Sequence, residues 1–420
     1  MHTIRITDRP KDQSTSETFL GGALTVVSRS GLHLTERLLL DNLPRLGAPP
    51  ASLLVAGNRS GAVTAAAAAR FPGCALTCHA FDFHHARAIG RNLGANGLAS
   101  HLVHDPFVTC AAPLPAEPPP PPAVAVHCTS ALPAGPYAAA LFMSTPGTMT
   151  GELVLDQLED LHRNLADGGL CLLACEADSV LLAKQVRAIF GNLSVVYDKK
   201  GVSCLLAKKR APLARPRDFS AEFPASLPGL APCTLTSLPG VFCHRRPDAG
   251  GLALAEIAAR ELTPGRRVLD MGCGCGLVGI LLARSQPDTA VTFVDSHARA
   301  LAATRRNLET LGLLDRSTLV LSDSGLEEAP NSPTLERPNF RTLELPSQHS
   351  FLLFVGNPPY YSDFRIAELF IQTAYGALAP GGICLTVAKA ARALQERQAE
   401  RFGHAEVLPR RGYGVVKSIR

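Results

Sequence analysis

The sequence predicts two tandem α/β units, each built on a doubly wound parallel sheet, within a chain of 420 residues. Two observations predict this architecture: short apolar runs alternate with helical patterns, and one ordered series of motifs occurs twice. Strands of a parallel sheet are buried on both faces, which is why they appear as continuous apolar runs. We place the units at residues 1–210 and 211–420. On this division, a chain beginning near Phe219 would contain the complete second sheet.

The repeat is carried by motifs that return in the same order. Arg91-Asn92-Leu93, near the end of a predicted helix, returns as Arg306-Asn307-Leu308, 215 positions later (306 − 91). The glycine pair opening the run Gly168–Leu172 returns in Gly381–Leu385, again followed by apolar residues. Two matches in one order indicate a duplicated domain, because chance matches would have no common order.

Composition narrows the class of protein. The chain is 46% hydrophobic and 18% charged, which is typical of a globular protein, and its net charge of +5 does not by itself indicate nucleic-acid binding. The N-terminus lacks a signal-peptide pattern, and no apolar run is long enough to span a membrane. The twelve cysteines form no pair of C-x-x-C clusters. We therefore expect reduced thiols, no metal site and a cytoplasmic location.

A glycine loop in the second unit predicts a cofactor site. A predicted strand ends at Asp270 and runs into Gly272, Gly274 and Gly276, and the next strand ends at Asp295. Glycines allow close backbone approach to a ligand, and a terminal carboxylate on the second strand can accept from ribose hydroxyls. The loop also fits a dinucleotide pattern, but the Asp270 carboxylate would repel a pyrophosphate. This acid favours S-adenosylmethionine, whose methionyl portion is cationic.

A second motif lies at the end of a later strand. The apolar run Phe351–Val355 is followed by Asn357, Pro358, a second proline and Tyr360. The Asn357 amide oxygen and the Pro358 carbonyl are acceptors for a planar NH2 group, and Tyr360 can stack on the ring that carries it. The motif resembles the N-P-P-(Y/F) sequence of methyltransferases that modify a nitrogen of a planar group. Asp323, at the end of the third strand, is a candidate acceptor for the adenine amino group.

The first copy lacks both motifs. At the position of the acid and glycine loop it has Val55-x-Gly57-Asn-Arg-Ser-Gly61, and we align Cys128–Ala131 with the motif that begins at Asn357. We therefore expect the first copy to be degenerate, with a structural or RNA-binding role. Basic residues near its end and near the C-terminus are either a solvated linker or phosphate contacts. They are Lys199, Lys200, Lys208, Lys209, Arg210, Arg215, Arg217, Arg410 and Arg411.

Upstream of the glycine loop stand Leu238-Pro-Gly-Val-Phe242 and Asp248-Ala-Gly250. With the two motifs above, these segments resemble the bacterial ribosomal RNA small-subunit methyltransferase C family, which are tandem-domain guanine-N2 methyltransferases. The resemblance implies a Rossmann-like class I methyltransferase fold and S-adenosylmethionine as cofactor. It also implies that Phe242, Asp248 and Gly250 line the cofactor pocket, and that a monomer acts on ribosomal RNA or a ribosomal subunit.

The chain departs from this family in three places. Tyr360 stands where phenylalanine is usual, Lys389 stands where asparagine is common, and residues 327–349 look like an insertion. Three alternatives remain: an N5-glutamine protein methyltransferase, an adenine-N6 nucleic-acid methyltransferase and an NAD-dependent oxidoreductase. The last would leave Asn357 and its prolines without a role.

Overall fold

The computed structural model describes residues 2–5, 16–19, 32–111, 123–144, 151–176, 179–199, 201–213, 215–326, 349–359 and 364–420. The chain forms two compact units. Residues 106–113 lie within the sequence of the first unit but belong to the second. The first unit comprises Met1–Asp105 and Leu114–Phe219, and the second comprises Pro106–Pro113 and Ser220–Arg420. No helix among the described residues is long and apolar enough to cross a membrane.

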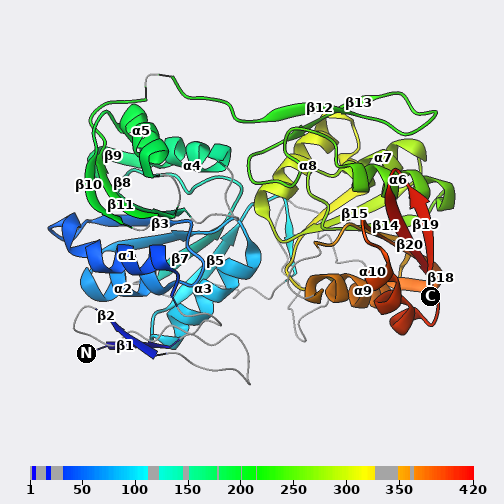
Figure 1. Ribbon diagram of the computed structural model, residues 1–420, viewed down its shortest axis with the longest axis horizontal. Helices are drawn as coiled ribbons and strands as arrows, with labels where there is room; N and C mark the ends of the chain where they lie inside the picture. The colour runs from blue at the N-terminus through cyan, green and yellow to red at the C-terminus, as the bar shows by residue number, and fades with distance from the viewer. Residues whose placement is uncertain are drawn as a thin grey trace. The chain divides into compact units, whose positions relative to one another are not determined.

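The first unit is an eight-stranded sheet with helices packed against it (Figure 1). In spatial order its strands are β10 (Ser194–Lys199), β11 (Val202–Lys208), β9 (Leu165–Glu176), β8 (Tyr137–Ser144), β3 (Ser52–Ala56), β4 (Ala75–His79), β7 (Val124–Cys128) and β5 (Ser100–His104). Its helices are α1 (Leu34–Asn42), the 3-10 helix η1 (Leu43–Leu46), α2 (Ala62–Arg70), α3 (Phe83–Ala95), α4 (Gly151–Asn164) and α5 (Ser179–Phe190). A small separate hairpin pairs β1 (His2–Arg5) with β2 (Ser16–Phe19).

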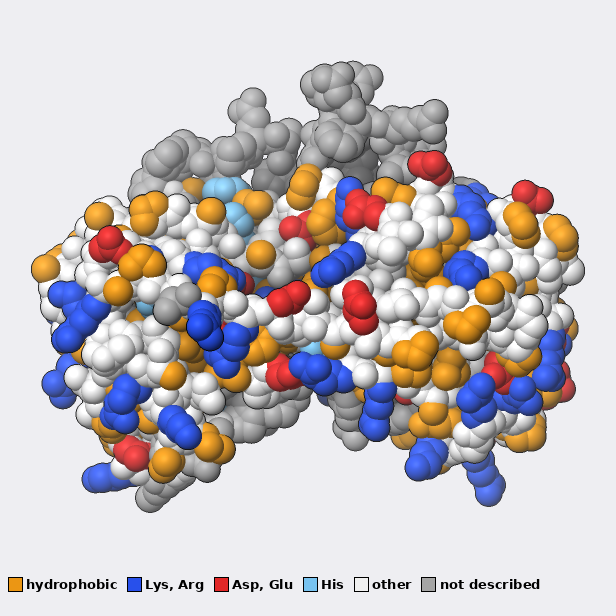
Figure 2. Space-filling model, turned by 90° about the horizontal axis from the view of Figure 1, so that it is seen from above, with side chains coloured by type: hydrophobic (Ala, Val, Ile, Leu, Met, Phe, Trp, Pro, Cys, Tyr) orange, Lys and Arg blue, Asp and Glu red, His pale blue; other side chains and the backbone are white. Residues whose placement is uncertain are grey.

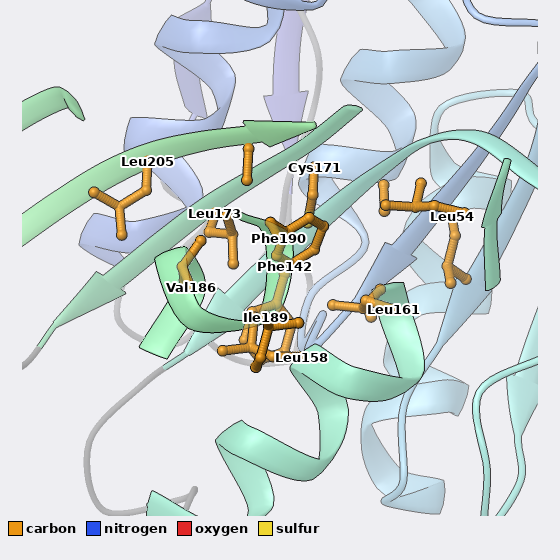
Figure 3. Close-up of a cluster of buried hydrophobic side chains, with 14 of the residues drawn as sticks. Leu54, Phe142, Leu158, Leu161, Cys171, Leu173, Val186, Ile189, Phe190 and Leu205 are labelled. Carbon is orange, nitrogen blue, oxygen red and sulfur yellow. The ribbon is translucent and has the colours of Figure 1, made fainter. Parts of the chain in front are cut away.

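One face of this sheet is buried beneath α4 and α5. Leu158 and Leu161 of α4 and Phe190 of α5 pack with Phe142 and Leu54 of the sheet in one apolar cluster (Figure 3). These residues recur on one side of each helix, as the amphipathic pattern of the sequence predicts.

The second unit repeats this arrangement. Its strands, in spatial order, are β19 (Glu406–Arg410), β20 (Tyr413–Ile419), β18 (Leu378–Ala388), β17 (Phe351–Gly356), β14 (Arg267–Met271), β15 (Ala290–Asp295), β16 (Ser317–Leu321) and β6 (Thr109–Cys110). Its helices are α6 (Ala249–Glu261), α7 (Leu277–Ser285), α8 (Ala298–Thr310), the 3-10 helix η2 (Leu314–Arg316), α9 (Arg365–Ala377) and α10 (Arg392–Phe402). The hairpin of β12 (Ala221–Ala225) and β13 (Cys233–Ser237) precedes α6. The predicted tandem α/β fold is confirmed.

Strand β6 corrects the expectation that the second sheet is complete from about Phe219. Thr109 and Cys110 pair in parallel with Val320 and Leu321 of β16, and the Ala111 amide donates to the Leu321 carbonyl at 3.1 Å. Ala111 is also buried in the core cluster that contains Val320. The second sheet therefore takes its edge strand from a segment 211 positions upstream of its neighbour (320 − 109), and no local sequence pattern predicts this pairing.

The register of the first sheet corrects a second expectation. Strand β7, which ends at Cys128, pairs with β4. The central strand β3 pairs with β4 on one side and with β8 on the other. In the second sheet the partner of the corresponding strand β14 is β17. Val55 pairs with Leu141 as Asp270 pairs with Val355, so Met143 stands at the position of Asn357. The alignment of Cys128–Ala131 with the Asn357 motif is wrong because β7 and β8 are both apolar runs, and only the strand pairing shows that β8 corresponds to β17.

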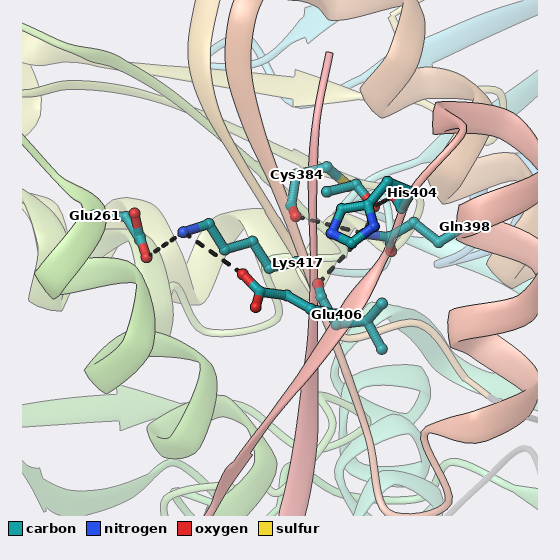
Figure 4. Close-up of polar contacts among 8 residues, drawn as sticks. Glu261, Cys384, Gln398, His404, Glu406 and Lys417 are labelled. Carbon is teal, nitrogen blue, oxygen red and sulfur yellow. Dashed lines mark hydrogen bonds and ion pairs between the residues drawn. The ribbon is translucent and has the colours of Figure 1, made fainter.

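Polar contacts fix the antiparallel end of the second sheet. The Lys417 ammonium on β20 donates to Glu261 of α6 at 2.7 Å (Figure 4). The buried Gln398 of α10 accepts from Thr386 at 2.7 Å and donates to Ser418 at 3.1 Å. These bonds satisfy buried polar groups and join two helices to the last strands of the sheet.

Candidate active site

The predicted site residues of the second unit gather at one edge of its sheet. Strand β14 pairs with β15 on one side and β17 on the other, with Asp270 opposite Phe293 and Val355. All three strands are parallel, so their carboxyl ends and the loops that follow lie at the same edge. Ligands of open α/β sheets bind at such an edge, where connections diverge to opposite sides of a central strand.

The glycine loop has a backbone that only glycine adopts easily. Gly272, Gly274 and Gly276 have φ of 68°, 59° and 84°, in the left-handed region. A Cβ on Gly272 would lie 2.8 Å from the Phe370 ring, and one on Gly276 would lie 2.8 Å from Ile280. The glycines therefore serve both the turn and the packing beneath it.

Asp295 holds this loop against the end of β15. Its Oδ2 accepts from the Gly274 amide at 2.9 Å, and its Oδ1 accepts from the His297 amide at 2.9 Å. The carboxylate is half-buried. These two bonds place the carboxylate at the carboxyl end of the second strand, where a ribose can be bound in folds of this type.

Asp270 is buried beneath the first turn of α7. Its Oδ2 accepts from the Gly279 amide at 2.8 Å. Burial raises the pKa of Asp270 to about 7, and the charge of Asp295 adds to this, while the Gly279 bond opposes it. A Cβ on Gly279 would lie 2.4 Å from the Phe293 ring and 2.9 Å from Asp270 Oδ2. The acid and the helix thus meet only because residue 279 has no side chain.

Two residues on α8 support the loop and were not singled out as site residues. Thr304 donates its hydroxyl proton to the Gly274 carbonyl at 2.9 Å. Asn307 donates to the Cys275 carbonyl at 2.9 Å and to Thr236 of β13 at 2.8 Å, and it accepts from the Thr236 amide at 2.7 Å. The repeated Arg-Asn-Leu motif was the sequence signal for Asn307, but the pattern did not show what it contacts.

The cysteines of the loop are packing residues. Cys273 and Cys275 are buried, and burial raises the pKa of the Cys275 thiol to about 12 and that of Cys273 as well. Both thiols are therefore protonated at neutral pH and poor nucleophiles. Among the described residues no group of three or more His, Cys, Asp or Glu side chains is arranged to hold a metal ion.

Asn357 makes a contact that the sequence did not predict. Its side-chain Nδ2 donates to Asp248 Oδ2 at 2.8 Å, and the same oxygen accepts from the Gly251 amide at 2.6 Å. Asp248 is the N-cap of α6, so the bond joins the start of a helix to the end of β17. Pro358 follows directly, and Tyr360 lies outside the described residues.

Fewer contacts describe the remaining predicted site residues. Phe242 is 69% exposed, so its predicted place in a cofactor pocket stays a prediction. A Cβ on Gly250 would lie 3.2 Å from Tyr413, which places this glycine beside the last hairpin. Asp323 is half-buried just after β16, and Lys389 is exposed. Residues 327–348 of the suspected insertion lie outside the described residues.

Part of the basic set is engaged within the units. Lys209 donates to the Leu165 carbonyl at 2.6 Å and Arg217 to Glu159 at 2.5 Å. Arg410 and Arg411 both bind the buried Glu256 carboxylate. On the face in Figure 2, Lys and Arg side chains are scattered over each unit with uncharged surface between them. These four cations therefore stabilise their own units, which weakens their interpretation as phosphate contacts.

The sequence of this chain is similar to those of known methyltransferases. The Methyltransferase small domain family matches residues 232–334. Ribosomal RNA small subunit methyltransferase C of Pseudomonas entomophila is 31% identical over 50% of this chain, and that of Pseudomonas aeruginosa is 30% identical over 49%. The matches cover 58% and 63% of these two relatives, so this chain spans somewhat more than half of their length.

A solved structure matches almost the whole chain. The T. thermophilus 16S rRNA N2 methyltransferase in complex with AdoMet and guanosine has a TM-score of 0.69 at 22% identity, covering 95% of this chain and 96% of that one. The match over both units shows that the tandem arrangement is shared and not only the second sheet. The chain therefore has the tandem fold of that solved structure, and its residues 232–334 match the Methyltransferase small domain family.

Proposed function

We propose that this chain is an S-adenosylmethionine-dependent methyltransferase that modifies the exocyclic N2 of a guanine in small-subunit ribosomal RNA. The observation that carries the proposal is the meeting of Asp270, Asp295 and Asn357 at the carboxyl edge of three adjacent parallel strands. The names of the matched relatives and the ligands of the matched structure support the same reaction.

The residues present fit the cofactor. Asp295 already orders the loop at Gly274, and a carboxylate at the end of the second strand can accept from ribose hydroxyls. Asp323 is the candidate acceptor for the adenine amino group, and Phe242, Asp248 and Gly250 complete the proposed pocket. The cofactor supplies an activated methyl group on a cationic sulfur.

The reaction needs orientation more than it needs a base. The lone pair of a guanine amino nitrogen is delocalised into the ring. Asn357 Oδ1 and the Pro358 carbonyl accept from the two amino hydrogens and favour a pyramidal nitrogen, which turns its lone pair toward the methyl carbon. Holding two reactants in line can supply much of the rate enhancement. The base must leave its stack to reach this edge, and Tyr360 receives its face.

The first unit argues against one alternative. N5-glutamine protein methyltransferases carry a small helical N-terminal domain, whereas residues 32–111, 123–144, 151–176 and 179–213 of this chain lie mainly in an eight-stranded α/β unit. We propose that the enzyme acts as a cytoplasmic monomer and that the first unit contributes to RNA binding.

Two measurements test the proposal. Calorimetry should find one S-adenosylmethionine site per chain and no comparable affinity for NAD. Mass mapping of ribosomal RNA from a deletion strain should show one guanine that has lost a methyl group and regains it with the purified enzyme. Unchanged methylation in the deletion strain, or a methylated adenine in place of guanine, would refute the assignment.

A further inference from the structure

The carboxylate of Asp248, placed above beside the cofactor, has contacts that its place in the pocket does not explain. Its Oδ2 accepts from the Asn357 side chain at 2.8 Å and from the Gly251 amide at 2.6 Å, and its Oδ1 lies 3.7 Å from the Cys243 thiol. The two bonded partners come from segments more than 100 positions apart, since residue 357 follows residue 248 by 109. One carboxylate thus contacts a helix end, a turn and the proposed catalytic amide.

The space around this carboxylate is built for it. A Cβ on Gly250 would lie 3.1 Å from Asp248 Oδ2, and one on Gly251 would lie 3.3 Å from the same atom. Both distances are tighter than ordinary carbon contacts, so the two glycines leave the room that the carboxylate occupies. The Asp-Ala-Gly-Gly sequence therefore does more than cap a helix, because a cap requires no glycine at the second and third helical positions.

The contact decides which way the Asn357 amide points. A side-chain amide has a donor end and an acceptor end of nearly identical shape, so packing alone discriminates poorly between its two orientations. An ionised carboxylate only accepts hydrogen bonds, so it selects the donor end. Asn357 Nδ2 therefore faces Asp248, and Oδ1 points away from it.

We propose that Asp248 is a positioning residue that fixes the Asn357 amide with its oxygen toward the target nitrogen. The inference rests on the proposed function, in which that oxygen accepts from the amino group being methylated. Without Asp248, the Asn357 amide is flipped in a fraction of the molecules. Its NH2 group then faces the amino group of the guanine. The amide must then be reoriented in each turnover, which lowers kcat more than it raises KM.

Two substitutions separate positioning from capping. Serine and asparagine are both good N-cap residues, so Asp248→Ser and Asp248→Asn should keep α6 and melt within a few degrees of the wild type. The serine hydroxyl is too short to reach Asn357 while it caps Gly251. The asparagine oxygen can occupy the place of Oδ2 and accept from both partners. We expect Asp248→Ser to lose about 10- to 100-fold in kcat on ribosomal RNA, and Asp248→Asn to retain at least a third of it.

The alternative roles of Asp248 give different results. If Asp248 only caps α6, the two variants have equal kcat values near that of the wild type. If its charge instead binds the cationic cofactor, Asp248→Asn weakens S-adenosylmethionine affinity in calorimetry and is as slow as Asp248→Ser. Either result overturns the inference.

A spectroscopic measurement tests the contact without any activity. In protein labelled with 15N at asparagine, the Asn357 side-chain signal is assigned by its loss in Asn357→Ala. We expect its amide protons to exchange slowly with water in the wild type and in Asp248→Asn, and faster in Asp248→Ser. Fast exchange in the wild type overturns the inference even if the protein methylates RNA. A wild type with slow exchange and no methylation refutes the proposed function while the positioning contact stands.

Discussion

The two sheets of this protein differ less in their scaffold than in what their strand ends carry. Gly61 and Gly276, 215 positions apart (276 − 61), both precede a helix with φ of 84°. Asn92 donates to the Ser60 carbonyl in the first unit, as Asn307 donates to the Cys275 carbonyl in the second. In both units a buried asparagine on the second helix after the loop, α3 or α8, therefore bonds the loop that follows the central strand.

The chemistry differs at the corresponding positions. Val55 stands at the position of Asp270 and Ala80 at that of Asp295, so the first copy has neither acid. Thr64 stands at the position of Gly279, and its hydroxyl accepts from the buried Asn58 side chain at 2.9 Å. In the first copy the Thr64 side chain thus bonds the loop to helix α2. At the same position in the second copy, Gly279 has no side chain and its amide bonds to Asp270.

The difference shows that the scaffold does not depend on the active site. The turn, the helix and the asparagine bond persist where the acids are absent, because they satisfy backbone groups that every such loop must pair. The acids bond backbone amides in the second copy, but the first copy forms the same turn and helix without them, so this scaffold does not require them. Their presence in one copy alone supports the proposal that this copy binds the cofactor.

The sharpest way to break the comparison is to remove the amide that the first copy lacks. Asn357→Ala leaves the glycine loop intact, so we expect kcat to fall about a hundredfold or more with cofactor affinity nearly unchanged, because the amide acts mainly in the transition state. Methylation assays and calorimetry measure the two effects. Full activity in this variant would show that the motif is only a turn after β17.

Removing an acid should affect only the second copy. Asp295→Ala should weaken S-adenosylmethionine binding by roughly 1–3 kcal/mol, because it removes an acceptor for the ribose and frees the Gly274 amide. The matched control is Asp82→Ala, which removes the N-cap acid of α3 in the first unit. We expect the control to bind cofactor like the wild type. Two equivalent sites in calorimetry would contradict the degeneracy of the first copy.

Substitutions at the corresponding positions 64 and 279 also test whether only the second copy binds the cofactor. Gly279→Ala places a Cβ 2.4 Å from the Phe293 ring, so we expect a loss of roughly 1–3 kcal/mol in stability and weaker cofactor binding as α7 shifts away from Asp270. Thr64→Ala should cost about 1–2 kcal/mol through its lost hydrogen bond to Asn58 and leave cofactor binding unchanged. Denaturant unfolding and calorimetry on both variants give the comparison.

Burial of the ionisable Asp270 should make the stability of the protein depend on pH, whereas Val55 at the corresponding position cannot ionise. The pKa of Asp270 is about 7 in the folded state, above the ordinary 3.8. Between pH 4 and pH 7 the Asp270 carboxyl is therefore protonated in the folded state and ionised in the unfolded state. Stability therefore falls as pH rises from about 4 to about 7 and then levels off. Asp270→Asn removes this loss, and we expect its stability relative to the wild type to be roughly 4 kcal/mol greater at pH 8 than at pH 4.

The same variant should bind S-adenosylmethionine more weakly at pH 8, because it lacks the carboxylate. Thermal unfolding of the free proteins across this pH range, with calorimetry at pH 8, measures both effects. An equal stability difference at the two pH values would mean that Asp270 is ionised in the folded state throughout.

The smallest effect is expected at β6, where the second sheet has a strand from outside its own copy. Ala111→Pro removes the amide that donates to Leu321, and should cost about 1 kcal/mol in stability with a modest loss of cofactor affinity near Asp323. Ala111→Gly keeps the amide and serves as the control. Identical unfolding curves for the two variants would show that the β6 pairing is not formed in solution.

The sequence by itself determined the repeat, the glycine loop and the order of motifs in the second copy. These features are local: an apolar run, a glycine after it and a helical pattern each depend on residues a few positions apart. Asp270, Asp295 and Asn357 were found this way because each directly follows or ends a recognisable strand. The sheet edge they share follows from the parallel topology that the alternation predicts.

Only the tertiary structure decided which strands and side chains meet. The place of β6 beside β16, the pairing of β3 with β8 and the bond from Asn357 to Asp248 all join segments far apart in the chain. Strand pairing depends on backbone hydrogen bonds, which carry no residue-specific pattern, so two short apolar strands such as β7 and β8 cannot be ranked as neighbours from sequence. The raised pKa of Asp270 likewise depends on burial beneath α7, which only packing creates.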